Sequence, residues 1–138
     1  ATLPQSSQNS LTTLASTFSN CLSLQSVNLP TAMTGVTTCS STFNDCRSLT
    51  GATFPASMTS LTLFPNAFLN CSSLQSVTLP TTINGGGATC FSSTFNGCEN
   101  IKSITLPTTI TSNTTPTTMQ TTFQNCYSVK ILHYQQVY

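Results

Sequence analysis

Charged side chains are nearly absent from this sequence of 138 residues. Three residues are Lys or Arg and two are Asp or Glu, so that 4% of the chain is charged, whereas about 25% is usual for a soluble domain. The net charge of +1 provides no field to attract nucleic acid or anionic lipid, and we expect neither partner. Disorder is not predicted, because 38% of the residues are hydrophobic and disordered chains are poor in such residues.

Histidine, acidic residues and long apolar runs are too few for several kinds of site. His133 is the only histidine, Asp45 and Glu99 are the only acids, and no Cys-x-x-Cys pair occurs. These residues form neither a catalytic triad nor a zinc site, so we predict that the chain is no enzyme and uses no cofactor. No apolar run approaches the roughly 18 residues of a membrane-spanning helix, and we therefore predict no membrane insertion.

What the chain has in excess is small hydroxyl side chains, with 28 Thr and 20 Ser, and a repeated pattern. Five segments follow the frame F-x-[N/D/G]-C-x-x-[L/I/V]-x-x-[V/A/I/L]-x-[L/F/Y], and a proline closes the first four. Their phenylalanines lie 25, 25, 27 and 28 residues apart, at Phe18, Phe43, Phe68, Phe95 and Phe123. The frame covers nearly the whole length, which predicts one domain, residues 1–138, built from repeats.

Each position of the frame has a physical interpretation. Its last residues alternate apolar and polar, which predicts a short strand with one buried face, and the proline ends that strand. Stacked repeats would pair these strands in a parallel sheet. The position before each cysteine holds Asn, Asp or Gly, the residues that best tolerate a left-handed backbone, so we predict a tight corner there. A single repeat cannot bury its apolar positions alone, but a stack can.

The frame F-x-x-C-x-x-L-x-x-V-x-L-P resembles the BspA-type leucine-rich repeat, a family found on bacterial surfaces, in some phage proteins and in protist surface proteins. The resemblance implies an α/β-class leucine-rich-repeat solenoid, mostly β and irregular, right-handed, with one short parallel strand per coil on its concave side. The opposite side would hold turns, short helical pieces or a second short strand. About five coils of 25–28 residues would span approximately residues 5–30, 31–55, 56–80, 81–107 and 108–138. This fold hosts adhesion, recognition and structural roles.

The cysteines allow more than one interpretation. Five of the seven form a ladder in the frame: Cys21, Cys46, Cys71, Cys98 and Cys126. The ladder would serve redox or metal chemistry, or it would pack as a column of buried, reduced thiols, which agrees with the resemblance. Cys39 matches an apolar core position. Cys90 lies one place away from that position, which makes it the candidate for an exposed thiol, since an odd number of cysteines leaves one unpaired in a secreted chain.

Several polar positions are candidates for glycan. Thr108–Thr122 contains nine Thr and one Ser, a composition typical of O-glycosylated segments, although a bulging turn without sugar explains it equally well. Two Asn-x-Ser/Thr acceptors would carry N-linked glycan in a glycosylating compartment. The candidate residues for covalent glycan are Asn113, Thr114, Thr115, Thr117, Thr118 and, less favourably at its tight corner, Asn70. Lys102 and Lys130 occupy equivalent positions, where they would bind a carboxylate-bearing sugar or remain solvated.

The outward strand positions form an array of small polar side chains. They are Ser26 and Asn28, Gly51 and Thr53, Ser76 and Thr78, Ser103 and Thr105, Ile131 and His133. An uncharged hydroxyl array suits a surface that binds carbohydrate or ice, although the wet face of any strand in a Thr-rich protein would look similar.

From these features we predict an extracellular structural protein, or one on a cell or virion surface, that assembles with copies of itself into a filament or surface layer. The chain is nearly all repeat, has no polar caps and carries little charge to oppose association. Unprotected parallel edges are templates for another copy. The candidate interface residues are Leu3, Leu11, Val129, Ile131, Leu132 and Tyr134. The alternative is a monomeric binding or adhesion module whose concave Ser/Thr face takes glycan, protein or ice.

Overall fold

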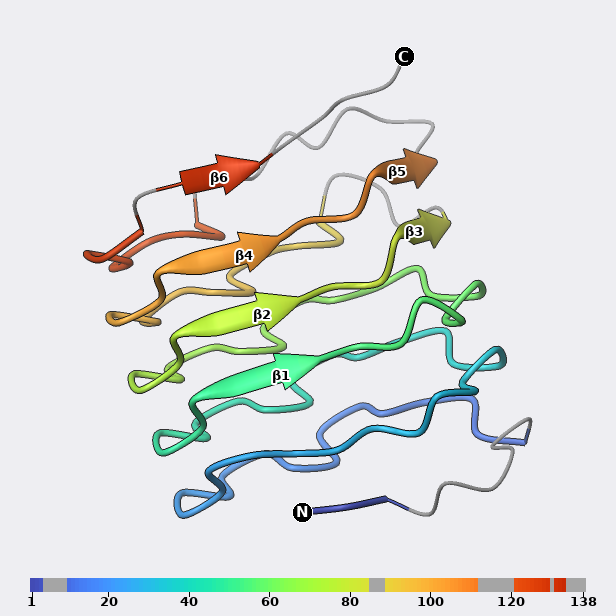
Figure 1. Ribbon diagram of the computed structural model, residues 1–138, viewed down its shortest axis with the longest axis horizontal. Coiled ribbons are helices and arrows are strands. Elements are labelled where there is room, and N and C mark those ends of the chain that lie inside the picture. Colours follow the sequence, from blue (N-terminus) through green and yellow to red (C-terminus); the bar gives the residue numbers. More distant parts are fainter. Residues whose placement is uncertain (4–9, 85–88, 112–120, 130, 134–138) are drawn as a thin grey trace.

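Short strands and turns, repeated one above another, make up the fold of this chain (Figure 1). The computed structural model describes residues 1–3, 10–84, 89–111, 121–129 and 131–133. These ranges form no helix, and accordingly no helix among them could span a membrane. Six strands of three residues each are present: β1 (Gly51–Thr53), β2 (Ser76–Thr78), β3 (Thr82–Asn84), β4 (Ser103–Thr105), β5 (Thr109–Thr111) and β6 (Ile131–His133).

Four of these strands form one parallel sheet in the order β1-β2-β4-β6. A single bridge between Ser26 and Gly51 continues the pairing into the first repeat. The central residues of the four strands are paired in register, in the order Ala52, Val77, Ile104 and Leu132. The predicted strands and their parallel pairing are confirmed, because each strand occupies the alternating end of the frame, and in β1, β2 and β4 a buried apolar residue lies between two more exposed positions.

A second parallel pair joins β3 and β5, at the right of Figure 1. Both strands follow the proline that closes a frame, and in both an isoleucine lies between two polar residues, with Ile83 opposite Ile110. Ile83 is buried and Ile110 is half-buried. The fourth and fifth coils therefore contain the second short strand that was one of the alternatives for the side opposite the sheet, because a second alternating triplet can bury one side chain after the turn.

The segment around each phenylalanine contains turns held by two alternating sets of backbone hydrogen bonds. In the second repeat, the N–H groups of Cys39, Ser41, Phe43 and Asp45 donate to carbonyl oxygens of the third repeat at 2.8–2.9 Å. The N–H groups between them donate within the repeat, for example from Asn44 to the Ser41 carbonyl at 3.2 Å. Alternate donors thus hold the turn and the stack together, and the buried backbone keeps its partners.

Left-handed residues make these turns possible. The position before each cysteine has a φ of 61°, 58°, 60°, 76° and 60° at Asn20, Asp45, Asn70, Gly97 and Asn125. The predicted tight corners are therefore confirmed. A second left-handed residue lies four positions earlier in the first four repeats, with φ between 51° and 55°, at Ser16, Ser41, Asn66 and Ser93. This second corner is not predicted from the repeated frame.

The core is a set of columns that run through the stack, and the phenylalanine column is the most regular. Neighbouring rings along Phe18, Phe43, Phe68, Phe95 and Phe123 stack with centroids 5.3, 5.3, 5.5 and 5.6 Å apart. The three central rings are completely buried and the two terminal ones are half-buried. The column of Leu49, Leu74 and Ile101 behaves alike, with half-buried Leu24 and Val129 at its ends. In these two columns, burial is complete only where a repeat has a neighbour on both sides.

Candidate functional surfaces

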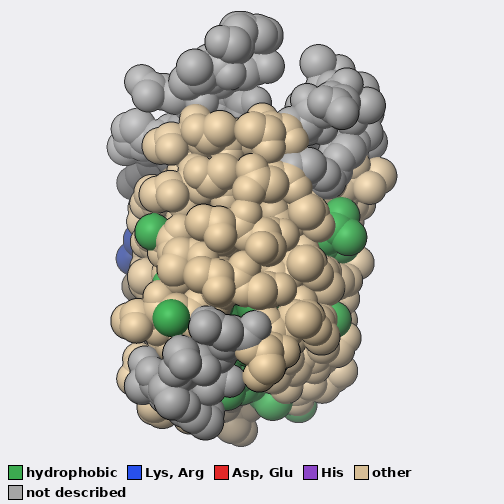
Figure 2. All heavy atoms as spheres, turned by 90° about the vertical axis from the view of Figure 1, so that its right-hand side faces the viewer, with side chains coloured by type: hydrophobic (Ala, Val, Ile, Leu, Met, Phe, Trp, Pro, Cys, Tyr) green, Lys and Arg blue, Asp and Glu red, His purple; other side chains and the backbone are tan. Residues whose placement is uncertain are grey.

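The outward face of the sheet carries the predicted array of small polar side chains. Ser76, Thr78, Ser103 and Thr105 are exposed on either side of the buried residues of β2 and β4, and Thr53 is exposed on β1. Neighbouring strands lie roughly 4.8 Å apart, so the hydroxyls recur at that interval along the stack. The side of the molecule that carries β3 and β5 is likewise covered mainly by uncharged polar atoms (Figure 2).

Threonine hydroxyls in other columns are occupied by the backbone of the neighbouring repeat. Thr37 donates to the Thr12 carbonyl at 3.2 Å, and Thr62 donates to the Thr37 carbonyl at 3.0 Å. The buried Thr94 hydroxyl donates to the Phe64 carbonyl at 2.8 Å. Within the described residues, by contrast, the hydroxyls of the sheet face make no hydrogen bond, at Thr53, Ser76, Thr78, Ser103 and Thr105. These hydroxyls are available to a ligand.

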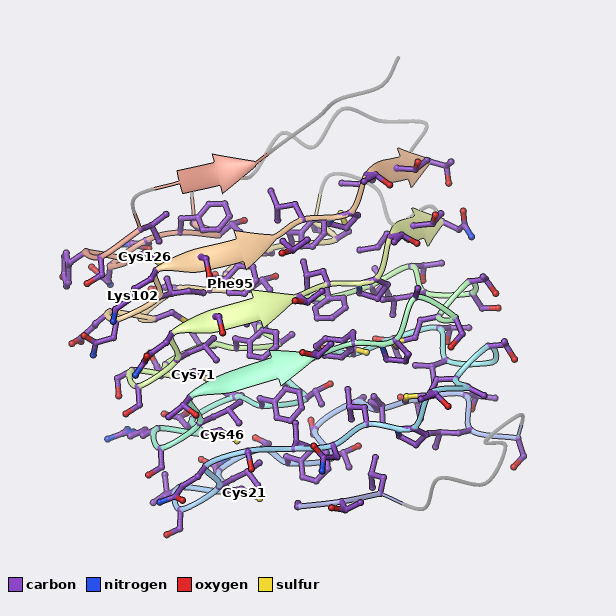
Figure 3. All side chains as sticks on the ribbon, viewed as in Figure 1. Cys21, Cys46, Cys71, Phe95, Lys102 and Cys126 are labelled. Carbon is purple, nitrogen blue, oxygen red and sulfur yellow. The ribbon has the colours of Figure 1, made fainter. Side chains whose placement is uncertain are left out.

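The cysteine ladder has a structural role that packing alone does not describe (Figure 3). Each thiol from the second repeat onward donates to the carbonyl oxygen of the phenylalanine one repeat earlier, at 3.0–3.1 Å, from Cys46, Cys71, Cys98 and Cys126. No described cysteine is in a disulfide, and no metal-binding cluster occurs among the described side chains. The predicted burial is confirmed for Cys46, Cys71 and Cys98, whereas Cys126 is half-buried and the prediction is wrong for Cys21, which is exposed. The first repeat has no earlier phenylalanine carbonyl for its thiol.

The prediction that Cys90 is exposed is also wrong. Its side chain is 1% exposed and belongs to the hydrophobic core. The equivalent residues of the two preceding repeats, which also lie five residues before their phenylalanines, are Thr38 and Leu63. These two residues form a parallel bridge with each other. Cys90 instead lies in a turn, after a segment that is two residues longer than in the earlier repeats, and the turn points the thiol into the core. The exposed described thiol is that of Cys21.

Burial suppresses ionisation of the other thiols. Loss of hydration raises the pKa of Cys39 from 9.0 to about 12 and those of Cys46 and Cys126 to about 11, partly offset by hydrogen bonds to each group. Burial also raises the pKa of Cys71, Cys90 and Cys98. Since the thiolate is the reactive species, these cysteines are poorly suited to redox or nucleophilic chemistry.

We expect brief treatment of the folded protein with iodoacetamide near neutral pH to alkylate Cys21 first. Cys21 is exposed, whereas the remaining six cysteines are buried or half-buried and hold their protons. Peptide mass mapping after labelling measures the fraction modified at each position, and a denatured sample, in which all seven cysteines react, calibrates it. Labelling of Cys90 as fast as that of Cys21 would contradict this assignment.

The remaining predicted residues fall in three groups. Leu3, Leu11 and Val129 are half-buried, Asn70 and Lys102 are exposed, and Ile131, Leu132 and His133 form β6. Tyr134, Lys130, Asn113, Thr114, Thr115, Thr117 and Thr118 lie outside the described residues. Glycosylation of Asn113, the nearby threonines and Asn70 therefore stays a prediction.

The first and last repeats expose complementary backbone groups in the turn segment. In the last repeat, the N–H groups of Phe123 and Asn125 occupy donor positions of the alternating pattern, and neither has an acceptor within the described residues. In the first repeat, the carbonyl oxygens of Thr17 and Ser19 occupy the acceptor positions, and they accept no hydrogen bond from this part of the chain. The sequence predicts unpaired backbone groups at the edge strands of the two ends, but not these groups of the turn segment. The corner residues before each cysteine indicate where these turn segments lie, and they were the only signal in the sequence for the open groups.

Comparison with known proteins finds one similarity. The family model described as "BspA type Leucine rich repeat region" matches residues 5–130 in six copies, one more than the five frames recognised in the sequence. No curated protein sequence and no solved structure matches the chain.

Proposed function

Because the chain belongs to the BspA-type leucine-rich repeat family, we propose that it is an extracellular structural protein, which stacks head to tail into a filament or surface layer. In this proposal the repeats form a right-handed solenoid of about five coils. The family is associated with surface proteins and is typically a non-enzymatic binding or structural repeat, which supports a location on a cell or virion surface.

The complementary open edges carry this proposal. Within the chain, the Phe95 N–H donates to the Thr122 carbonyl of the next repeat at 2.9 Å. In a head-to-tail contact, the Phe123 N–H would donate in the same way to the Thr17 carbonyl of the next copy. The Asn125 N–H would donate to the Ser19 carbonyl of that copy. The contact therefore repeats a geometry that the chain already uses between its own repeats, which is the property of a heterologous interface that propagates.

Side chains at the two ends match in the same manner. Phe123 stacks on Phe95, and Phe18 stacks on Phe43, so Phe18 of the next copy would continue the column on the free side of Phe123. The thiol of Cys21 would donate to the Phe123 carbonyl, as each later thiol donates to the preceding phenylalanine. The proposed interface also includes Leu3, Leu11, Val129, Ile131, Leu132 and Tyr134.

Sedimentation velocity and negative-stain electron microscopy of the 138-residue chain test this assembly. We expect the wild type to form oligomers whose size increases with protein concentration and to appear as filaments or sheets. Cys21→Arg should remain a folded monomer, because Cys21 is exposed in the single chain, whereas a contact would bury the arginine charge. Ile131→Asp tests the opposite end in the same way.

Thr78→Arg is the matched control, because it adds the same charge to an exposed position of β2, in the middle of the sheet face. It should assemble as the wild type does. A wild-type chain that remains monomeric at high concentration contradicts head-to-tail stacking, and so does loss of assembly in Thr78→Arg together with Cys21→Arg.

The unoccupied hydroxyls of the sheet face favour a second candidate function. Thr78 and Thr105 belong to a flat, uncharged array that the fold does not use for its own hydrogen bonds within the described residues. If the wild-type chain is monomeric, we propose instead that it is a binding or adhesion module that takes glycan, protein or ice on this face.

A further inference from the structure

All five charged residues of the sequence occur in one short part of the frame, between the position before each cysteine and the fourth position after it. Four of them are described, and they place both signs of charge on a single edge of the stack: Asp45, Arg47, Glu99 and Lys102. Apart from the N-terminal ammonium of Ala1, the remaining described surface is uncharged. This edge is therefore chemically different from the hydroxyl face and from the ends.

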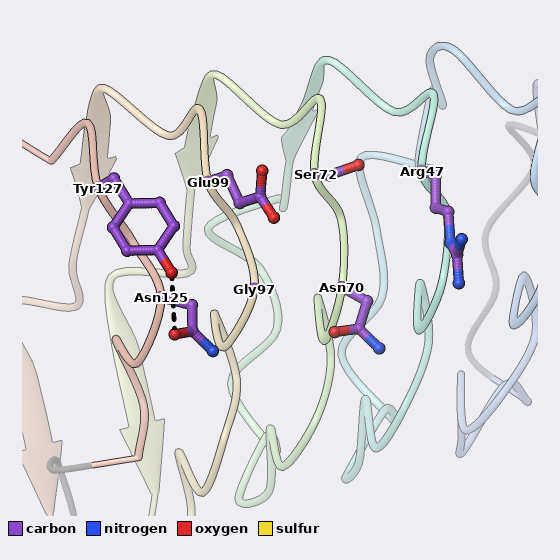
Figure 4. Close-up of a pocket in the computed structure, with 7 residues that line it drawn as sticks. All are labelled: Arg47, Asn70, Ser72, Gly97, Glu99, Asn125 and Tyr127. Carbon is purple, nitrogen blue, oxygen red and sulfur yellow. Dashed lines mark hydrogen bonds between the residues drawn. The ribbon is translucent and has the colours of Figure 1, made fainter.

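A hollow of about 420 Å³ lies on this edge, and a missing side chain creates it (Figure 4). The position before each cysteine holds Asn or Asp in every repeat except the fourth, where it is Gly97. A Cβ atom at Gly97 would come within 2.7 Å of Asn70 Oδ1, so a side chain there would enter the space above Asn70. Around Gly97 the hollow is lined by Arg47, Asn70, Ser72, Glu99, Asn125 and Tyr127.

Hydrogen bonds orient side chains at both ends of the hollow. Tyr127 is 77% exposed, and its hydroxyl donates to Asn125 Oδ1 at 3.2 Å, which orients the ring at one end of the hollow. At the other end, Asp45 accepts hydrogen bonds from Arg47 at 3.2 Å and from Asn70 at 3.4 Å. Such ordering before binding lowers the entropy that a ligand must overcome.

The chemistry of the lining selects a hydroxyl-rich ligand. Small-molecule sites of about 300–1,000 Å³ are usually apolar, whereas this lining is polar apart from one aromatic ring. Arg47 donates, Glu99 accepts, and Asn70 does both. A sugar ring matches this set, since its hydroxyls donate and accept while its C–H face packs on an aromatic ring. We propose that the hollow over Gly97 binds a neutral saccharide unit of a glycan.

Charge decides against acidic sugars. Arg47 is already paired with Asp45, whereas Glu99 has no ion pair among the described residues. The hollow over Gly97 thus carries an excess of one negative charge, which disfavours a carboxylate or sulfate in this hollow, whereas Lys102 lies in the neighbouring one.

The site continues past this first hollow. Asn100, the residue after Glu99, donates to the Ser72 carbonyl at 2.8 Å and lines a second hollow of about 280 Å³ with Thr50, Ser73, Gln75 and Lys102. The two hollows lie next to each other along the chain at residues 72–73 and 99–100. The site therefore accommodates an oligosaccharide of two or more units rather than one monosaccharide.

Nuclear magnetic resonance titration of the isotope-labelled chain tests this site with maltotriose, cellotriose and tri-N-acetylchitotriose as neutral probes and trigalacturonic acid as the acidic probe. We expect saturable shifts of the Gly97, Glu99 and Tyr127 amides with at least one neutral probe, in the millimolar range typical of a shallow site, and none with the acid. Tyr127→Ala should weaken binding about tenfold, because it removes the stacking ring. The absence of saturable shifts with every neutral probe would overturn the proposal.

Gly97→Asn is the sharpest variant, because it fills the hollow with the residue type that already occupies this corner at Asn125, where φ is 60°. The new Cβ would lie 2.7 Å from Asn70 Oδ1 and 3.3 Å from Asn70 Cα, so the Asn70 side chain must turn aside and the backbone around it must shift slightly. Binding should be lost while the amide spectrum stays folded. Gly51→Asn is the control, since Gly51 lies on the sheet and has room for a Cβ at 3.4 Å from the Ser76 carbonyl oxygen. Unchanged binding in both Gly97→Asn and Tyr127→Ala would overturn the location, and acidic binding would overturn the charge argument.

Discussion

Replacement of Phe68 by alanine should lower the free energy of unfolding by about 3–5 kcal/mol. Phe68 is completely buried in the central repeat, where its ring stacks between Phe43 and Phe95 and meets Phe54 edge to face. Its neighbours cannot close the cavity, since the backbone N–H of Phe68 is fixed to the Thr94 carbonyl at 2.9 Å and that of Phe43 to Ala67 at 2.8 Å. Urea unfolding followed by circular dichroism measures the loss.

Phe123→Ala is the matched control for this prediction. The chemical change is identical, but Phe123 is half-buried and stacks within the described residues only on Phe95. Its loss of stability should be distinctly smaller than that of Phe68→Ala. Equal losses, or a loss below about 1 kcal/mol for Phe68→Ala, would mean that the phenylalanine column does not form the core.

Alkaline pH should destabilise the protein strongly, and the thiols are the cause. Burial raises the pKa of Cys39 to about 12 and that of Cys46 to about 11, from an ordinary value of 9.0. Above pH 9 the thiols of the unfolded chain ionise while those of the folded chain keep their protons, so unfolding releases protons. The free energy of unfolding is therefore unaffected by the thiols below pH 9, and it falls as the pH rises from 9 to the pKa of the folded thiols. Each thiol contributes a slope of up to about 1.4 kcal/mol per pH unit. Urea unfolding at pH values from neutrality to about 11 measures the total slope.

Cys39→Ala separates this effect from simple packing. The variant loses stability at neutral pH, but its stability should fall less steeply with alkaline pH, by up to about 1.4 kcal/mol per pH unit, because one buried thiol is gone. Leu49→Ala, at an equally buried position without a thiol, should lose stability and keep the wild-type slope. Identical slopes in both variants would show that Cys39 does not govern the alkaline response.

The features that depend on local residue type could be predicted from the sequence. The strand at Ser76–Thr78 follows from one apolar residue between two polar ones, and Pro80 shows where the frame closes. The left-handed corner at Asn70 follows from the tolerance of Asn for positive φ. Stacking then follows, because the inward positions of one repeat need a neighbour.

Features that depend on the alignment of successive repeats could not be predicted as well. Cys90 was assigned to the surface from its sequence offset, but an insertion of two residues changes which way a side chain points. The hollow at Gly97 needs a comparison down a column of equivalent positions, since Gly97 taken alone only indicates a corner. The corners at Ser16 and Ser93 were missed because serine is abundant throughout the chain and gives no local signal.

The direction of the hydrogen bonds between the segments around the phenylalanines gives this side of the stack an electrostatic polarity, whereas bonds in other columns, such as that from Thr62 to the Thr37 carbonyl, run the opposite way. Every such bond has its N–H in the earlier repeat and its carbonyl in the later one, as from Phe18 to Thr42 and from Phe68 to Thr94, both at 2.9 Å. Aligned peptide dipoles add, as they do along a helix, but here their sum runs across the chain, parallel to the stacking axis. The Phe123 end is therefore the positive pole and the Thr17 end the negative one. Two copies that met through identical ends would oppose like poles, so this side of the molecule favours growth in one direction over two-fold symmetric pairing.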